Sequence, residues 1–237
     1  MIGVFINVIT VLIGSSIGLL FKKGIPENVS SAAMTGLGAC TLYIGISGSL
    51  QGENVLILIA SVVLGAILGT LWNLDGRINH LAEKVESGFR KNGKDISIAE
   101  GMISATLLFC VGSMTVTGSI QAGLTGDNSV LITKAMLDLV SSMMLASSLG
   151  VGVLFSAFAV FLIQGGLVLF AGLISPLMSA GAIHEMNCAG SILIMMIGTN
   201  LMGMTKIKVA DYLPAIVFAP VLYNLLPLFE KLWNLIA

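Results

Sequence analysis

The chain has 237 residues, of which 56% are hydrophobic and 10% are charged, and its mean hydropathy is +1.02. This composition leaves too little polar surface to solvate a water-soluble globule of this length, so lipid must surround most of the chain. The net charge of -1 gives no general attraction to nucleic acid, which is not expected as a partner. We expect a single integral membrane domain over residues 1–237, with the lipid bilayer as its main partner, and exclude a sizeable soluble domain.

Apolar stretches along the chain are each long enough to cross a bilayer core, which takes about 20 residues per helix. In chain order, we expect transmembrane helices at residues 2–21, 30–50, 55–74, 101–124, 129–149, 151–174, 188–204 and 213–228. The predicted fold class is therefore all-α, a polytopic transmembrane helix bundle of about eight helices.

One long polar stretch, at about residues 75–100, separates the third and fourth expected spans. Its apolar residues Ile78, Leu81, Val85 and Phe89 are spaced to fall on one stripe of a helix. This pattern is typical of an amphipathic helix that lies on the membrane surface. We therefore predict a cytoplasmic amphipathic connector, for which a solvated linker and a regulatory segment remain alternative interpretations.

Most of the eleven Lys and Arg residues fall in three short stretches, at residues 22–23, 77–94 and 206–208. Cationic loops of membrane proteins remain in the cytoplasm. Eight spans place all three stretches on that side only if the N-terminus lies outside. The first apolar stretch lacks the positive start of a secretory signal and is followed by lysines, which indicates a retained first helix.

Two ionisable residues lie within the fifth expected span. Lys134 and Asp138 are four residues apart, so they share one face of a helix and can pair. Charged side chains inside a membrane are costly and frequently mark a solute or proton pathway. Two readings stay open: a structural pair, with Lys134 extending towards the interface, and a pathway site in which the deeper Asp138 is the better candidate.

Glycine is abundant, with 28 residues, and pairs such as Gly14 with Gly18 or Gly65 with Gly69 recur at four-residue spacing. Small residues at this spacing let membrane helices pack closely, and they also favour a homo-oligomer. Residues 112–119 combine glycine with hydroxyl side chains, so the fourth helix is expected to unwind locally where it lines a cavity. The candidates for a substrate or ion pathway are Asp138, Lys134, Ser113, Thr115, Thr117, Ser47, Thr199 and Asn200.

The other polar residues within the apolar stretches have a structural reading. Amides such as Asn7, Gln164 and Asn187 are expected to bridge helices by hydrogen bonds. His184 and Glu185 are expected to cap the outer end of a helix and face water. The three cysteines have no CxxC spacing and no nearby His or carboxylate cluster, so we expect them to pack in helices and predict no metal site.

Short strings repeat along the chain. Residues 48–52 resemble residues 118–123, and residues 13–16 resemble residues 197–200. Transporters are frequently built from internal repeats whose broken helices meet near the bilayer midplane. Duplication and independent solutions to close helix packing both explain strings of this length.

Three longer segments carry a resemblance to a known family. They are the N-terminal Gly3-Val4-Phe5-Ile6-Asn7 with its glycines at 14 and 18, the stretch from Gly65 to Ile78, and Cys110-Val111-Gly112-Ser113-Met114-Thr115. In these segments the chain resembles the YdfK/YqgA-type bacterial membrane proteins, a family of unknown function. The resemblance implies a multi-pass protein of the bacterial inner membrane and supplies no catalytic or binding residues.

Enzyme motifs are missing from the sequence, which contains no HExxH, GxSxG, P-loop or dinucleotide-binding turn. We therefore expect no enzyme and no cofactor. The leading hypothesis is a secondary transporter or channel for a small solute or ion of unknown identity. The alternative hypothesis is a non-transporting membrane scaffold or partner-binding subunit.

Overall fold

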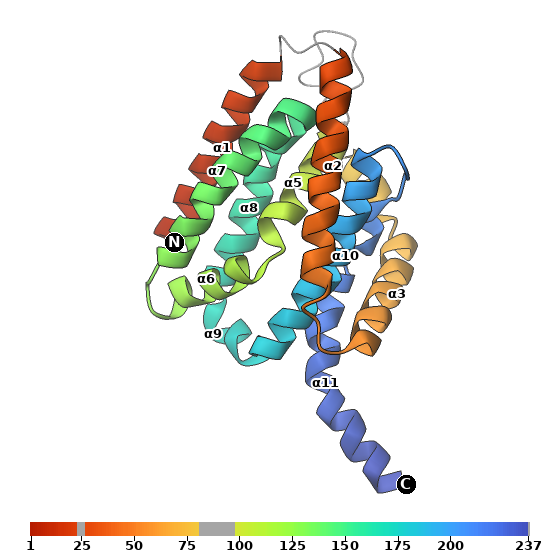
Figure 1. Cartoon of the computed structure of the whole chain (residues 1–237). Helices are drawn as coiled ribbons and strands as arrows, with labels where there is room; N and C mark the ends of the chain where they lie inside the picture. The colour runs from red at the N-terminus through yellow and green to blue at the C-terminus, as the bar shows by residue number, and fades with distance from the viewer. Residues whose placement is uncertain (23–26, 81–97, 237) are drawn as a thin grey trace.

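The computed structural model describes residues 1–22, 27–80 and 98–236, which form helices joined by short connections, with no strand among them (Figure 1). The helices are α1 (Ile2–Lys22), α2 (Glu27–Ser49), α3 (Val55–Leu71), α5 (Ile98–Cys110), α6 (Ser113–Leu124), α7 (Ser129–Leu149), α8 (Gly152–Leu169), α9 (Ala171–Ile174), α10 (Ala180–Leu201) and α11 (Ala215–Ile236), with 3₁₀ turns η1 (Ser175–Leu177) and η2 (Val209–Tyr212). The expected all-α membrane bundle is confirmed.

Five segments of the described chain are long and apolar enough to cross a membrane: Ile2–Phe21, Ser129–Leu149, Gly152–Leu169, Ala180–Leu201 and Val209–Pro227. Two bent pairs of helices raise the number to as many as seven. The described residues thus contain five to seven candidate spans, where the sequence suggests about eight. The difference is α2, whose glycine and hydroxyl residues lower its hydropathy although it is 23 residues long.

The two bent pairs differ from the continuous spans expected at these places. Val55–Leu71 continues into Leu74–His80 with a bend of 54°, and Ile98–Cys110 continues into Met114–Leu124 with a bend of 62°. The second bend coincides with the start of the glycine- and hydroxyl-rich stretch, where local unwinding is expected. Beyond His80, the expected amphipathic connector lies mostly outside the described residues.

The helices form two groups that meet along a seam. One group contains α1, α5, α6, α7 and α8, and the other contains α2, α3, α10 and α11 (Figure 1). Across the seam, α10 contacts both α5 and α6.

Glycines bring the closest helix pairs together. A Cβ atom at Gly14 or Gly18 of α1 would overlap backbone carbonyl oxygens of α7, and a Cβ at Gly38 of α2 would lie 2.8 Å from the carbonyl oxygen of Gly198 in α10. The packing role expected of Gly14 and Gly18 is thereby confirmed. Because these glycine-containing helix faces pack against other helices of the same chain, they do not support the expected homo-oligomer.

The connections found at each end of the bundle agree with the distribution of Lys and Arg along the chain. Figure 1 places the end of α1, the start of α2 and the loop that follows α10 at one end, and the α2–α3 and α6–α7 connections at the other. The cationic residues 22 and 206–208 therefore belong to the same end. The final helix runs away from that end, and its C-terminal half projects beyond the bundle.

The seventh span begins earlier than expected, at Ala180 instead of Cys188. Ser179 caps the helix, since its Oγ accepts a hydrogen bond from the Ala182 N–H at 3.3 Å. His184 and Glu185 consequently lie inside α10 and not at its end. The expectation that Glu185 faces water is wrong, because this residue is 1% exposed.

Candidate functional site

The break between α5 and α6 is the main irregularity inside the bundle. Gly112 precedes the first turn of α6 and provides no side-chain cap, so the first N–H groups of α6 have no intrahelical acceptor. Thr115 bridges the break, since its Oγ1 donates to the Phe109 carbonyl oxygen at 3.0 Å. The break therefore has a defined geometry and brings the C-terminal end of one helix close to the N-terminal end of another.

An open cavity of about 280 Å³ lies at this break. Its lining comes from α2, from the break itself and from α10, namely Tyr43, Ile44, Ser47, Gly48, Gln51, Val111, Gly112, Asn187, Ser191 and Ile194. Each of these side chains is uncharged. Asn187 is 7% exposed, and its buried Oδ1 has no hydrogen-bond partner within the described chain.

A second cavity, of about 420 Å³, lies where α10 ends. It is more polar and carries charged groups, with a lining of Asp75, Asn79, Glu100, Ile103, Ser104, Ile197, Asn200, Gly203, Thr205, Lys206, Ile207, Lys208 and Val209. It opens at the cationic end of the bundle. The first cavity, which Gln51 of the α2–α3 connection helps to line, therefore lies towards the end of the bundle opposite the second cavity.

Both cavities touch the same side of α10. Ile194 lines the first cavity and Ile197, about one turn further along the helix, lines the second. The side chains of Leu107 in α5 and of Leu193 and Ile197 in α10 are buried and belong to the main apolar core.

Asn200 organises the wall of the second cavity. Its Oδ1 accepts hydrogen bonds from the Ile207 N–H at 2.9 Å and the Thr205 Oγ1 at 2.7 Å, and its Nδ2 donates to the Ile207 carbonyl oxygen at 2.8 Å. The Thr199 hydroxyl donates to the Met196 carbonyl oxygen and lies 2.8 Å from Thr205 Oγ1. The polar side chains expected near the end of the seventh span thus hold the following loop in place.

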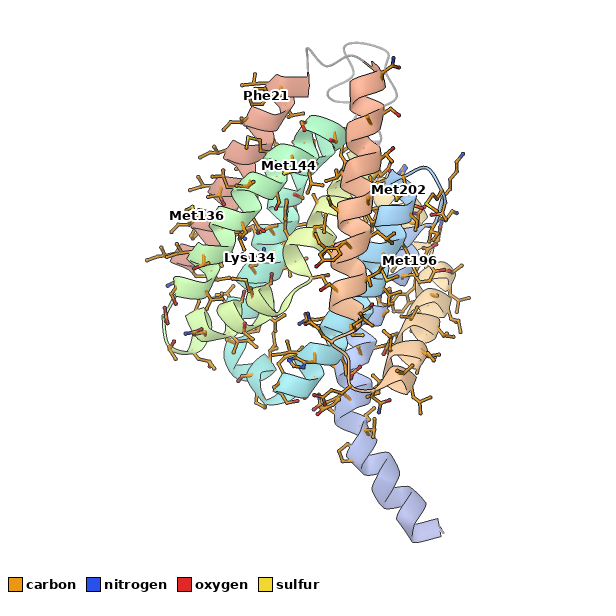
Figure 2. All side chains as sticks on the ribbon, in the orientation of Figure 1. Phe21, Lys134, Met136, Met144, Met196 and Met202 are labelled. Carbon is orange, nitrogen blue, oxygen red and sulfur yellow. The ribbon has the colours of Figure 1, made fainter. Side chains whose placement is uncertain are left out.

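The Lys134–Asp138 pair lies elsewhere, within the group of α1, α5, α7 and α8. Both side chains are buried and form a direct ion pair, and Lys134 Nζ lies 6.0 Å from the centre of the Phe109 ring. Figure 2 shows Lys134 within the bundle, whereas Met136, two residues further along α7, lies at the outer surface. Neither member of the pair lines the two cavities.

Amide side chains add a polar contact near this ion pair. Asn7 Nδ2 donates to Gln164 Oε1 at 3.1 Å, which joins α1 to α8. Both amide side chains are fully buried. These contacts confirm the bridging role expected of Asn7 and Gln164, and the arrangement favours the structural reading of the ion pair.

The residues chosen from the sequence are therefore divided among several places. Ser47 lines the first cavity, Asn200 lines the second, Thr115 bridges the helix break, and Thr117 is exposed. Ser113 is the first residue of α6. Asn187 was expected to bridge helices by a hydrogen bond, but its Oδ1 has no partner within the described chain, and a single amide in an apolar helix gives no indication that it lines a cavity.

The cysteines and acidic residues of the described chain do not gather into a metal site. No three His, Cys, Asp or Glu side chains lie close enough there to hold a metal ion. The three cysteines are free thiols, of which Cys110 and Cys188 are buried and Cys40 is exposed. Cys188 donates to the Ser49 carbonyl oxygen at 2.9 Å and so helps to join α10 to α2.

The fold and these sites define a multi-pass integral membrane protein. The chain belongs to the family described as "Protein of unknown function (DUF554)", which matches residues 2–224. The family match covers nearly the whole chain and confirms the resemblance noted in the sequence.

Two curated relatives cover almost the same length. The chain is 34% identical over 225 residues to the "Uncharacterized membrane protein YdfK" of Bacillus subtilis, an alignment that covers 93% of this chain and 95% of that protein. It is 30% identical over 221 residues to the "Uncharacterized protein YqgA" of Escherichia coli, covering 92% of this chain and 94% of that protein. No solved structure matches the chain.

Proposed function

We propose that this protein is a secondary transporter or channel for a small polar solute in the bacterial inner membrane. The observation that carries the proposal is Asn187, which lines a cavity at a helix break and whose buried Oδ1 has no hydrogen-bond partner within the described chain. A buried acceptor without a donor is costly, so its presence needs an explanation. Broken helices within a membrane bundle are typical of transporter binding sites.

The route of the solute follows the seam between the two helix groups. One cavity lies at the break between α5 and α6, the other lies at the cationic end, and α10 lines both. Buried apolar side chains of α5 and α10, among them Leu107 and Ile197, are proposed to close the route between them. Transport then requires α10 to move relative to α5, as in transporters in which one group of helices rocks against the other.

We assign the energy for transport to gradients of the solute or of an ion across the membrane. The sequence contains no P-loop, so the proposed transport is secondary or passive. Loops rich in Lys and Arg favour the cytoplasm, so we place the cavity lined by Lys206 and Lys208 on the inside and the N-terminus outside. The cavity at the helix break then communicates with the outer side.

Reconstitution into liposomes tests this proposal. We expect solute-dependent currents, measured on a solid-supported membrane, or counterflow of labelled solute when amino acids, organic acids, polyols and cations are screened. In Gly112→Leu, the new side chain enters the cavity, because a Cβ atom at this position has no neighbour within 4 Å. This substitution is expected to abolish the transport signal.

Gly166→Leu in α8 is the matched control. A Cβ atom there also has no neighbour within 4 Å, but Gly166 does not line either cavity. Equal transport by the two variants would contradict the proposed route. Absence of uptake and current over the full set of solutes, with intact protein in the liposomes, would refute transport and leave the membrane scaffold as the better hypothesis.

A further inference from the structure

We infer that the cavity at the break between α5 and α6 binds a small zwitterion, a molecule with one carboxylate and one ammonium group such as a free amino acid. This inference rests on the proposed function and names the class of solute. It depends on three properties of the cavity: the two helix ends that meet there, the unpartnered amide of Asn187, and the absence of charge among its lining residues.

The start of α6 supplies a site for the carboxylate. The N-terminal end of a helix carries a partial positive charge and N–H groups without intrahelical acceptors. Gly112, which lines the cavity, leaves open space next to these groups, because a Cβ atom at that position would meet nothing within 4 Å. A carboxylate oxygen can therefore approach the first turn of α6 closely.

The end of α5 and Asn187 supply acceptors for the ammonium group. The C-terminal end of a helix carries a partial negative charge on its last carbonyl groups, and only two residues separate the end of α5 from the start of α6. Asn187 of α10 also lines the cavity, and its buried Oδ1 has no donor within the described chain. An ammonium group between these acceptors would satisfy the amide oxygen.

Charge balance selects against other solutes. None of the described residues that line this cavity is charged, and the Lys134–Asp138 pair is neutralised internally and lies elsewhere. A solute with a net charge would enter without a counter-charge, which is unfavourable in a low-dielectric bundle. A zwitterion brings both charges and finds a dipole of opposite sign for each. The volume of about 280 Å³ is near the lower end for ligand sites and requires a small molecule.

Binding and counterflow in proteoliposomes test the inference with four matched solute classes: zwitterionic amino acids, monocarboxylates, primary amines and polyols. We expect labelled amino acids to bind and exchange, and the other classes to compete weakly. Asn187→Ala should weaken amino-acid binding by about tenfold to a hundredfold, the effect of losing one hydrogen bond to a charged group. Asn187→Asp adds a negative charge and should shift the preference towards primary amines.

His184→Ala is the control, since His184 lies on the same helix but is exposed and does not line the cavity. Size-exclusion profiles establish that each variant is folded. Uptake of monocarboxylates, amines or polyols without competition by amino acids would overturn the inference and leave transport intact. Equal amino-acid affinity in Asn187→Ala and His184→Ala would also overturn it. Absence of binding and uptake in every class would overturn both the inference and the proposed function.

Discussion

Glu185 and Asn54, which are 131 residues apart in sequence, are joined by a hydrogen bond of 2.9 Å from the Asn54 backbone N–H to Glu185 Oε1. The same oxygen accepts from the Glu53 N–H, also at 2.9 Å. Asn54 caps α3 through its own side chain. At the other end of α3, Asp211 Oδ1 accepts from the Asp75 N–H at 2.9 Å. Two carboxylates thus hold both ends of the bent α3 segment against the rest of its helix group.

Removal of the Glu185 carboxylate is expected to destabilise the protein. Glu185→Ala leaves two backbone N–H groups without their acceptor, which costs about 1–3 kcal/mol. Glu185→Gln keeps an oxygen for both groups and should remain close to the parent protein. Thermal unfolding in detergent measures the difference. Equal Tm values for the two variants would show that the carboxylate does not hold the α2–α3 connection.

Neutralising one member of the Lys134–Asp138 pair should cost more than neutralising both. Lys134→Met or Asp138→Leu leaves one buried charge uncompensated, with an expected loss of about 3–5 kcal/mol. The combination Lys134→Met with Asp138→Leu removes both charges and should recover most of that loss. A double-mutant cycle on unfolding in detergent gives the coupling energy.

The same variants separate the two readings of the ion pair. If the double variant folds and keeps solute counterflow, the pair is structural. Lost counterflow in a well-folded double variant would instead place Asp138 in the solute pathway.

A methyl group at Gly14 should disturb the contact between α1 and α7. The new Cβ would overlap the Leu139 carbonyl oxygen, so the helices must move apart, at a cost of about 1–3 kcal/mol. Gly166→Ala is the control, because its Cβ meets open space and alanine favours a helix. We expect a lower Tm and a lower monodisperse yield for Gly14→Ala alone. A Tm shift of the same size in both variants would contradict the close packing.

Loss of Asn200 should release the loop that follows α10. Asn200→Ala removes three hydrogen bonds to Thr205 and Ile207, whereas Asn200→Asp retains the two in which Oδ1 accepts. We expect faster trypsin cleavage after Lys206 and Lys208 in the alanine variant and an intermediate rate in the aspartate variant. Identical cleavage of all three proteins would mean that the loop is held by other contacts.

Labelling of single cysteines tests the orientation. In a variant without native cysteines, Lys22→Cys and Lys206→Cys should react with an impermeant maleimide only in inverted vesicles, because cationic ends face the cytoplasm. Asp127→Cys, in the connection between α6 and α7, should react in intact spheroplasts. Reaction of positions 22 and 206 on opposite sides would rule out the common cationic end of the bundle.

The sequence predicted where the helix breaks, but it did not predict which side chains line the cavity at the break. Gly112 begins a run of glycine and hydroxyl residues that weakens a helix, and the bend occurs there. Asn187 and Ser47 reach this break from two other helices. To predict that these side chains lie at the same cavity, one must know which face of each helix points into the bundle.

In a membrane protein, the buried face and the lipid-facing face of a helix are both apolar, so hydrophobic periodicity does not indicate the direction of burial. This is why Asn187 was not chosen as a site residue. Glu185 was expected in water because the seventh span was expected to begin only at Cys188, whereas α10 begins at Ala180 and buries this residue. The sequence by itself determined the solvent of the chain, through its excess of apolar residues, and the shared end of its cationic loops. Only the tertiary structure decided which polar groups face one another, because contacts among helices distant in sequence set the rotation of each helix.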